Sequence, residues 1–121
     1  MPPKYNANQF KTTLIQERKE NPAEPDVRGI KVRWRTVRSI RAKLEWKDAV
    51  ERFDTDQMVP IQEVLVITRY FRDITEEDRL FDTVRRRWFQ VQSIVNVDEA
   101  DQFLEINCVK WPRGAADAVS A

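Results

Sequence analysis

Residues 40–46 read IRAKLEW, and the side chains of this stretch alternate strictly between apolar and charged. Successive side chains of a β-strand point to opposite faces of a sheet, so the four apolar residues here would share one face. Such a strand packs one face against a core and exposes the other to water. The stretch therefore predicts a half-buried strand of an antiparallel sheet.

The same period of two recurs on both sides of this stretch. It is present in 30–34 (IKVRW), in 89–97 (FQVQSIVNV) and in 102–109 (QFLEINCV). The run 64–71 (VLVITRYF) begins apolar on both faces, which indicates a central strand, and residues 12–16 (TTLIQ) predict a short opening strand. About six short strands predict an all-β fold, a small antiparallel β-barrel or sandwich.

One segment departs from the period of two. In WKDAVERFDTDQMVP, residues 46, 49, 50 and 53 are apolar at helical spacing, and Pro60 stops the pattern. We therefore expect one long loop or short helix over 47–60, between the second and third main strands.

Length and proline positions set the expected domain boundaries. A chain of 121 residues fits one domain, which we place over residues 10–111. Prolines near the ends and in ERKENPAEPD indicate flexible tails at 1–9 and 112–121 and a polar linker or loop at 18–28.

Composition argues against most kinds of active site. The chain has no histidine, one cysteine and only two glycines, which removes the commonest general base and a glycine-rich phosphate loop. We therefore expect no enzyme activity, no metal and no cofactor. The N-terminus lacks the apolar core of a signal peptide, and no stretch approaches the roughly 18 apolar residues of a membrane span.

The acidic clusters and the cysteine have structural interpretations. Asp98, Glu99 and Asp101 in NVDEADQ lie between two predicted strands and are typical of a turn. Thr75 followed by Asp78 indicates a helix cap or tight turn. Cys108 falls on the apolar face of its strand, where a buried, unreactive thiol is expected.

The basic residues are unevenly distributed although the net charge is only +1. Seven of them, and no acidic residue, lie between Val27 and Leu44, and a triplet follows later: Arg28, Lys31, Arg33, Arg35, Arg38, Arg41 and Lys43, then Arg85, Arg86 and Arg87. With tryptophans nearby, this pattern fits a solvated strand face, an OB-like surface for single-stranded nucleic acid, or a protein interface. The acidic patches at 76–78 and 98–101 favour the interface, because complementary faces on one subunit suit head-to-tail ring assembly.

Two longer segments resemble the head–tail joining family of tailed bacteriophages, also called head-closure or stopper proteins. They are ITRYFRDITEEDRLFD at 67–82 and WFQVQSIVNVDEADQFLEINC at 88–108. The family pattern runs from an apolar strand into Arg-Tyr-Arg, an Ile-Thr turn and an Arg-apolar pair. An aromatic strand, an Asp-Glu turn and a Leu-Glu-Leu-x-Cys strand follow. KTTLIQ at 11–16 and residues 40–45 resemble the two opening strands of the family, so the resemblance spans most of residues 10–110.

Two places depart from the family pattern. The hairpin before the aromatic strand usually holds a glycine, whereas this chain reads DTVRRRW. We expect this turn to avoid positive φ or to use Asp82 there. The usual Ser-Gly-x-Glu after the second strand is replaced by WKDAVERF.

The resemblance implies a structural subunit of a phage or prophage-derived particle. Such subunits form a homo-oligomeric ring, six- or twelve-fold, in the neck of the virion, after assembly in the host cytoplasm. The ring would lie between the portal-adaptor ring and the tail completion or tail tube protein. Packaged double-stranded DNA passes through the channel without sequence-specific binding, and in some members the ring closes that channel. No membrane is involved.

The resemblance also assigns candidate residues. The channel would be reached by the connection at 47–60, with Asp48, Glu51, Asp54 and Asp56 as the candidate channel loop. A mildly acidic loop would repel the phosphate backbone of the DNA. The candidate subunit and partner interface comprises ten residues: Arg33, Arg35, Arg69, Tyr70, Arg72, Arg85, Arg86, Arg87, Asp98 and Glu99.

Overall fold

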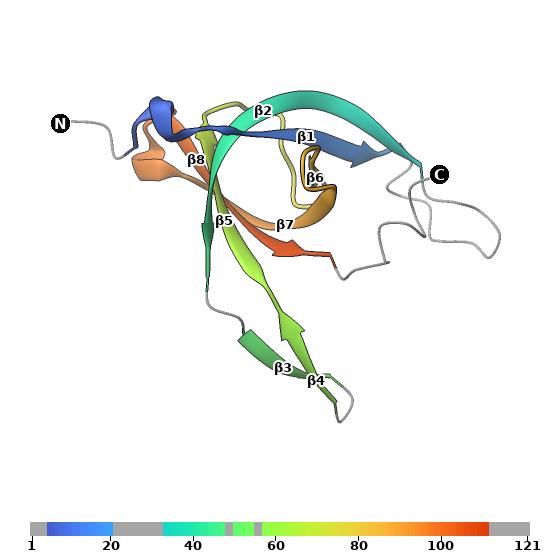
Figure 1. Ribbon diagram of the computed structural model, residues 1–121. Helices are drawn as coiled ribbons and strands as arrows, with labels where there is room; N and C mark the ends of the chain where they lie inside the picture. The colour runs from blue at the N-terminus through green and yellow to red at the C-terminus, as the bar shows by residue number, and fades with distance from the viewer. Residues whose placement is uncertain (1–4, 21–32, 48–49, 55–56, 112–121) are drawn as a thin grey trace.

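The opening stretch lies at the end of the longest strand, β2 (Trp34–Trp46), in a closed six-stranded antiparallel barrel (Figure 1). The computed structural model describes residues 5–20, 33–47, 50–54 and 57–111, and only the backbone at 50–61. Around the barrel the strand order is β1-β2-β5-β8-β7-β6. The other barrel strands are β1 (Thr12–Lys19), β5 (Glu63–Arg69), β6 (Arg79–Asp82), β7 (Arg87–Asn96) and β8 (Phe103–Lys110). The prediction of a small antiparallel barrel is confirmed.

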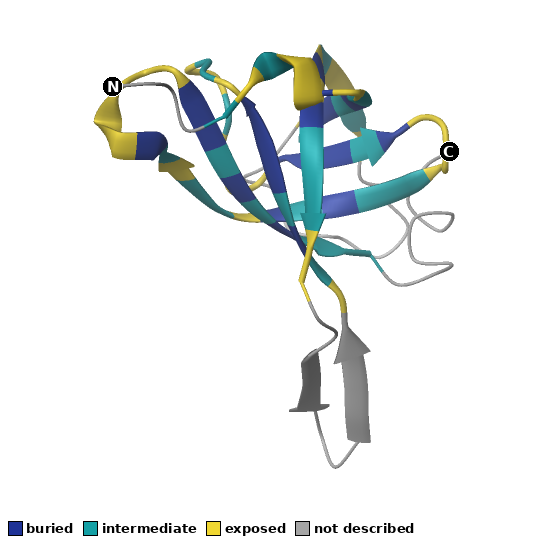
Figure 2. Cartoon of the chain, turned by 60° about the vertical axis from the view of Figure 1, so that its left-hand side comes forward, coloured by how far each residue is buried: buried dark blue, intermediate teal, exposed yellow. Residues whose placement is uncertain are grey.

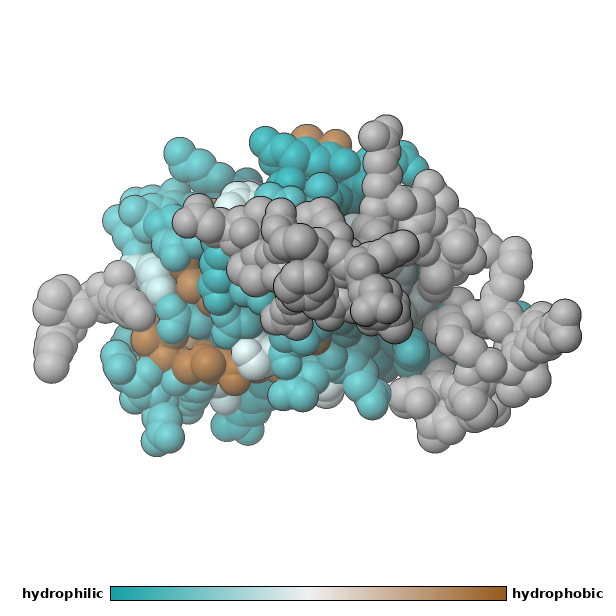
Figure 3. Space-filling model, turned by 90° about the horizontal axis from the view of Figure 1, so that it is seen from below, coloured by the Kyte–Doolittle hydropathy of each residue, from teal (hydrophilic) through white to brown (hydrophobic). Residues whose placement is uncertain are grey.

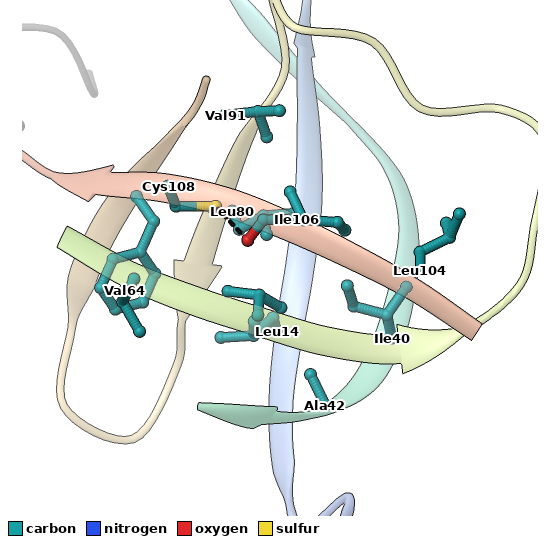
Figure 4. Close-up of a cluster of buried hydrophobic side chains, with 11 residues drawn as sticks. Leu14, Ile40, Ala42, Val64, Leu80, Val91, Leu104, Ile106 and Cys108 are labelled. Carbon is teal, nitrogen blue, oxygen red and sulfur yellow. Dashed lines mark hydrogen bonds between the residues drawn. The ribbon is translucent and has the colours of Figure 1, made fainter. Parts of the chain in front are cut away.

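Alternation in the sequence places the core inside the barrel. Leu14, Ile40, Val64, Val91 and Ile106, one from each of five strands, are at most 6% exposed and point into one cluster (Figure 4). Figure 2 shows the resulting change from buried to half-buried along the strands. Complete burial of a side chain of this size contributes about 1.5–3 kcal/mol, so the barrel interior is the main source of stability.

Cys108 belongs to the same core. It is 1% exposed, and burial raises the pKa of its thiol well above the ordinary value. The predicted buried thiol is confirmed.

A second apolar cluster lies on the outside of the barrel. Phe10, Ile67 and Phe103 pack together with Tyr5, and the rings of Phe10 and Tyr5 both meet Phe103 edge to face. The short 3₁₀ helix η1 (Ala7–Gln9) joins Tyr5 to Phe10, and the Tyr5 hydroxyl donates to the Glu105 carboxylate. Residues 5–9, which the sequence assigned to a tail, are therefore folded against β5 and β8.

The segment between β2 and β5 contains two strands and no helix among its described residues. β3 (Val50–Asp54) and β4 (Gln57–Ile61) pair as an antiparallel hairpin in a sheet of their own. Figure 1 shows this hairpin pointing away from the barrel. The expectation of a long loop or short helix is wrong: residues 50–54 pair with residues 57–61, and Pro60 lies within this pairing, opposite Glu51.

Strand boundaries differ from the prediction in three further places. The stretches 30–34 and 40–46 were expected to be separate strands, but Trp34–Trp46 is continuous, with a bulge opposite Gln16 and Glu17. β1 continues to Lys19, into the predicted linker, whose residues 21–28 lie outside the described part of the chain. β6, with only four residues, was too short to show a period.

Positive φ angles occur at non-glycine residues in two turns. Arg86 has a φ of 53° in the turn between β6 and β7, and Asp82 instead accepts bonds from the Val84 and Arg85 N–H groups. The expected use of Asp82 for positive φ is therefore wrong. The second turn follows β7 and contains the short 3₁₀ helix η2 (Val97–Glu99). Asp98, Glu99 and Asp101 in this turn have φ angles of 52–55°. The turn predicted for the acidic cluster is confirmed.

The barrel closes where β1 meets β6, and this seam contains only four residue pairs, from Leu14 with Asp82 to Glu17 with Arg79. Buried polar side chains reinforce it. Asp78 is 0% exposed and accepts bonds from Gln16 Nε2 at 2.7 Å, Arg18 Nε at 2.9 Å and the Thr75 N–H at 3.0 Å. The predicted tight turn at 75–78 is confirmed, but Asp78 faces inward rather than towards solvent.

We expect Asp78→Asn to destabilise the protein by about 2–3 kcal/mol at pH 7, because the buried Arg18 contact loses its charged partner. Burial alone would raise the Asp78 pKa, yet the bonds from Arg18, Thr75 and Gln16 outweigh it, and the net pKa lies below the ordinary 3.8. The carboxylate therefore contributes stability above that pH, and this is lost as the pH falls through the folded-state pKa. Urea denaturation at pH 7 and pH 3 should show a steeper loss for the unmodified protein than for the variant; equal losses would contradict this assignment.

Candidate interaction surfaces

The turn between β6 and β7 presents two arginines to solvent. Arg85 and Arg86 are exposed, beside Val84, which is 81% exposed. Arg87 differs from them, because its Nε donates to the Asp82 carboxylate at 3.0 Å and its guanidinium lies over the Trp46 ring at 4.6 Å. The structure therefore assigns Arg87 to an internal contact and leaves Arg85 and Arg86 as the basic turn.

The turn between β7 and β8 presents acid. Asp98 and Glu99 are exposed. Asp101 is bonded within the turn: its carboxylate accepts a hydrogen bond from Asn96 Nδ2 at 2.7 Å, and its N–H donates to Asn96 Oδ1 at 3.1 Å. This pair fixes the turn and leaves Asp98 and Glu99, the acidic turn, facing outward.

The basic turn and the acidic turn lie at opposite ends of β7 (Figure 1). A strand of 10 residues at about 3.3 Å per residue spans roughly 30 Å. Opposite charges at opposite ends of one strand give a subunit two different and complementary surfaces, which suits a head-to-tail contact between identical subunits. Both turns also hold non-glycine residues at positive φ, a conformation that costs energy and is found disproportionately at functional sites.

The remaining predicted interface residues lie elsewhere. Arg69, Tyr70 and Arg72 follow the end of β5 at the barrel rim, where both arginines are exposed. Arg33 and Arg35 lie at the start of β2 and are exposed as well. The predicted set is thus divided among several places and does not form one patch.

The candidate channel loop is described only in part. Asp48 and Asp56 lie outside the described residues. Glu51 and Asp54 fall in the backbone of β3, so their roles stay predictions.

Seen from below, hydrophilic residues dominate the described surface and hydrophobic ones form a short strip at its left side (Figure 3).

Sequence reasoning missed an arginine enclosed by aromatic rings. Arg79 is 1% exposed, and its guanidinium lies 4.1 Å from the Trp34 ring centroid, 4.9 Å from Trp111 and 5.3 Å from Trp88. Its Nε donates to Glu17 at 2.9 Å, and the Trp88 indole N–H donates to the same carboxylate oxygen. Burial lowers the Arg79 pKa, and Glu17 opposes this effect. Because these indoles already contact Arg79, they form no open platform on which nucleobases would stack, which disfavours the OB-like interpretation.

Other kinds of site find little support. In the part of the chain that the structure describes, no three histidine, cysteine or acidic side chains are grouped to hold a metal ion. None of the described helices has the length and apolar character needed to span a membrane.

Comparison with protein families identifies the chain. Residues 5–110 match the model described as phage head completion protein. The chain belongs to the phage head completion protein family. The match confirms the expected resemblance and covers nearly the whole described domain. A head completion protein is a structural component of the virion, so this chain is a virion protein.

Solved structures support the fold of this head completion protein. A chain of the "Virion of native gene transfer agent (GTA) particle" superposes with a TM-score of 0.65 at 16% sequence identity. The similarity covers 91% of this chain and 98% of that chain. At this identity the comparison shows a shared fold. Comparison with curated proteins gives no match.

Proposed function

We propose that this head completion protein is a non-enzymatic ring subunit at the head–tail junction of a phage or phage-derived particle. The observation that carries the proposal is the placement of Arg85 and Arg86 at one end of β7 and of Asp98 and Glu99 at the other. In the ring, the basic turn of each subunit meets the acidic turn of the next. Because the two surfaces differ, the contact repeats around an axis and closes when the rotation allows.

Val84 adds an apolar component to this contact. Its exposed fraction of 81% is the highest of the exposed large hydrophobic residues in the described chain. A valine surrounded by charge gains about 1–2 kcal/mol when a neighbour covers it, whereas exposed ion pairs contribute about 0–1 kcal/mol each. Charge therefore sets the orientation of the subunits, and burial of the turn supplies part of the affinity.

The β3–β4 hairpin would serve the channel. It has a sheet of its own and connects two adjacent barrel strands, β2 and β5. A ring of such hairpins directed at the axis would bring their acidic residues together and repel DNA phosphates. The portal-adaptor ring would contact one face of this ring and the tail completion or tail tube protein the other. Six- or twelve-fold symmetry follows from the family expectation, and electron microscopy of the neck would measure it.

A charge exchange tests the ring contact. The double variants Arg85→Glu/Arg86→Glu and Asp98→Lys/Glu99→Lys should each lower the yield of joined particles at least tenfold, because like charges meet at every contact. The variant with all four changes should restore the yield, since the charges are exchanged but still complementary. The yield is measured by electron microscopy of purified particles.

The matched control is Glu76→Lys/Glu77→Lys. This exposed acidic pair receives the same change of charge but lies in the turn before β6 and not at an end of β7. It should leave particle yield unchanged. A failure of the four-residue exchange to rescue, with each protein still folded by circular dichroism, would refute the ring contact.

A further inference from the structure

The pairing of β2 in the barrel is incomplete. This strand pairs with β1 from Trp34 to Ala42, but with β5 only from Ala42 to Trp46. Residues 34–41 therefore have a strand neighbour on one side only. An open strand edge presents unpaired backbone groups to which another extended chain can add.

The β2–β5 ladder shows which backbone groups face the open side. Lys47 N–H donates to Glu63 C=O, and alternate residues of an antiparallel strand point the same way, so the backbone of Ser39 and Arg41 also faces β5. β5 ends at Arg69 and pairs no further along β2. Thr68 Oγ1 donates to Arg41 C=O at 3.0 Å. The last residue pair of this ladder is Ala42 with Thr68, so the Ser39 N–H lies beyond it, on the side of β2 that faces away from β1.

A groove lies next to this open edge. Its volume is about 470 Å³, and its two walls are residues 38–41 of β2 and residues 68–71, where the chain leaves β5. Phe10 from the segment after η1 contributes an apolar surface. A space of this size falls in the range of about 300–1,000 Å³ typical of binding pockets.

The groove is strongly basic. Arg38, Arg41 and Arg69 line it, and none of the described residues that line it is acidic. Arg38 stacks over Phe71 at 4.6 Å, makes only a long contact of 3.9 Å to Asp73, and has a buried Nε without a hydrogen-bond partner. Ion pairs are absent for Arg41 and Arg69 in the described chain. Their guanidinium groups would each donate two hydrogen bonds to a carboxylate of the bound segment.

We propose that this groove binds an extended acidic segment of a different virion protein, which adds as a strand to the open edge of β2. The inference rests on the proposed assembly role and specifies one partner contact within it. Backbone bonds to Ser39 would fix the register, and the three arginines would bind acidic side chains. A second copy of this chain is a poorer occupant, since its exposed acidic pairs at 76–77 and 98–99 lie in turns. Residues 20–26 carry two prolines, which lack the N–H donors of a strand.

A crosslinking experiment tests the identity of the occupant. A photo-activated benzophenone side chain in place of Ser39 is incorporated into particles, irradiated and analysed by mass spectrometry. The expected product joins this position to an acidic segment of a non-identical virion protein. Crosslinks to a second copy of this chain, to DNA, or to no protein would each overturn the proposal.

Two variants test the mechanism of binding. Ser39→Pro removes the edge N–H and should lower joined-particle yield at least tenfold, with Ser39→Ala as control. Arg41→Glu/Arg69→Glu should lower it similarly, whereas Arg41→Lys/Arg69→Lys should retain most of it. Normal particle yield for the glutamate variant would refute the proposal that an acidic segment binds here. This result can occur even where the charge exchange at β7 restores the yield, so the two proposals are tested independently. Circular dichroism melting of each purified variant verifies folding.

Discussion

Particles whose head completion protein carries Asn-Gly in place of residues 48–62 are expected to assemble and then lose their DNA. The replacement removes the β3–β4 hairpin, which has no strand pairing with the barrel. Lys47 N–H donates to Glu63 C=O, so Asn-Gly between these two residues forms a two-residue hairpin turn of the favoured kind. Among the described residues, the replacement removes one backbone bond to the barrel, from Lys110 N–H to Gln62 C=O.

The physical reason is that the hairpins are proposed to narrow the channel and to line it with negative charge. Without them the barrel, and hence the ring contact, persists while the obstruction disappears. DNA retention after purification should fall from near complete to near zero. It is measured as nuclease-resistant DNA per particle, and the isolated variant should melt within a few degrees of the unmodified protein.

A charge-neutral hairpin is the matched control. Glu51→Gln/Asp54→Asn/Asp56→Asn keeps the hairpin and removes three carboxylates. If the obstruction is steric, these particles retain their DNA; if repulsion contributes, they release it more slowly or more quickly than normal in a salt-dependent way. Full DNA retention by the hairpin-less particles would exclude the hairpin from channel closure.

The largest effect on stability is expected for Arg79→Met, about 3 kcal/mol, or roughly 10 °C in melting temperature. Methionine keeps part of the packing among Trp34, Trp88 and Trp111 but removes the cation from three ring faces. It also leaves Glu17 with the Trp88 indole as its remaining donor. Removing one partner of a buried ion pair costs more than removing both.

Two further variants isolate the cause. Glu17→Gln/Arg79→Met removes both charges and should recover about half of the lost stability, measured by urea denaturation. Arg85→Met changes an exposed arginine and should stay within about 0.5 kcal/mol of the unmodified protein. Equal stability of Arg79→Met and Arg85→Met would show that enclosure of Arg79 by the tryptophan rings does not contribute to the free energy of unfolding.

Local alternation in the sequence was sufficient to predict the barrel strands that have one buried and one exposed face. IRAKLEW and QFLEINCV both became barrel strands because the barrel interior imposes the same period of two. The hairpin at 50–61 was missed, since valine and phenylalanine three residues apart fit one face of a helix and not the period of two of a half-buried strand. β6 was missed because four residues hold too little of any period.

The candidate interface was predictable only as a set of residue types. Exposure separated Arg85 and Arg86 from Arg87, which an Asp82 contact and two aromatic rings hold in place. Arg38 and Arg41 were noted only as part of a basic run. Their importance comes from the incomplete pairing of β2, which depends on where a strand distant in sequence ends.

The short β1–β6 seam has a consequence for how the chain folds. Its partners are separated by more than 60 positions, for example Gln16 and Asp78 at a separation of 62, whereas β7 and β8 are neighbours in sequence. Closing a long loop costs conformational entropy before the contacts at its ends can stabilise it. We therefore expect the β6–β7–β8 meander to form early and the seam to form last, stabilised by the ion pairs of Arg18 and Arg79. A newly made subunit would pass through an intermediate in which the barrel is an open sheet with two free edges. The ion pairs that close the barrel would set the lifetime of this intermediate.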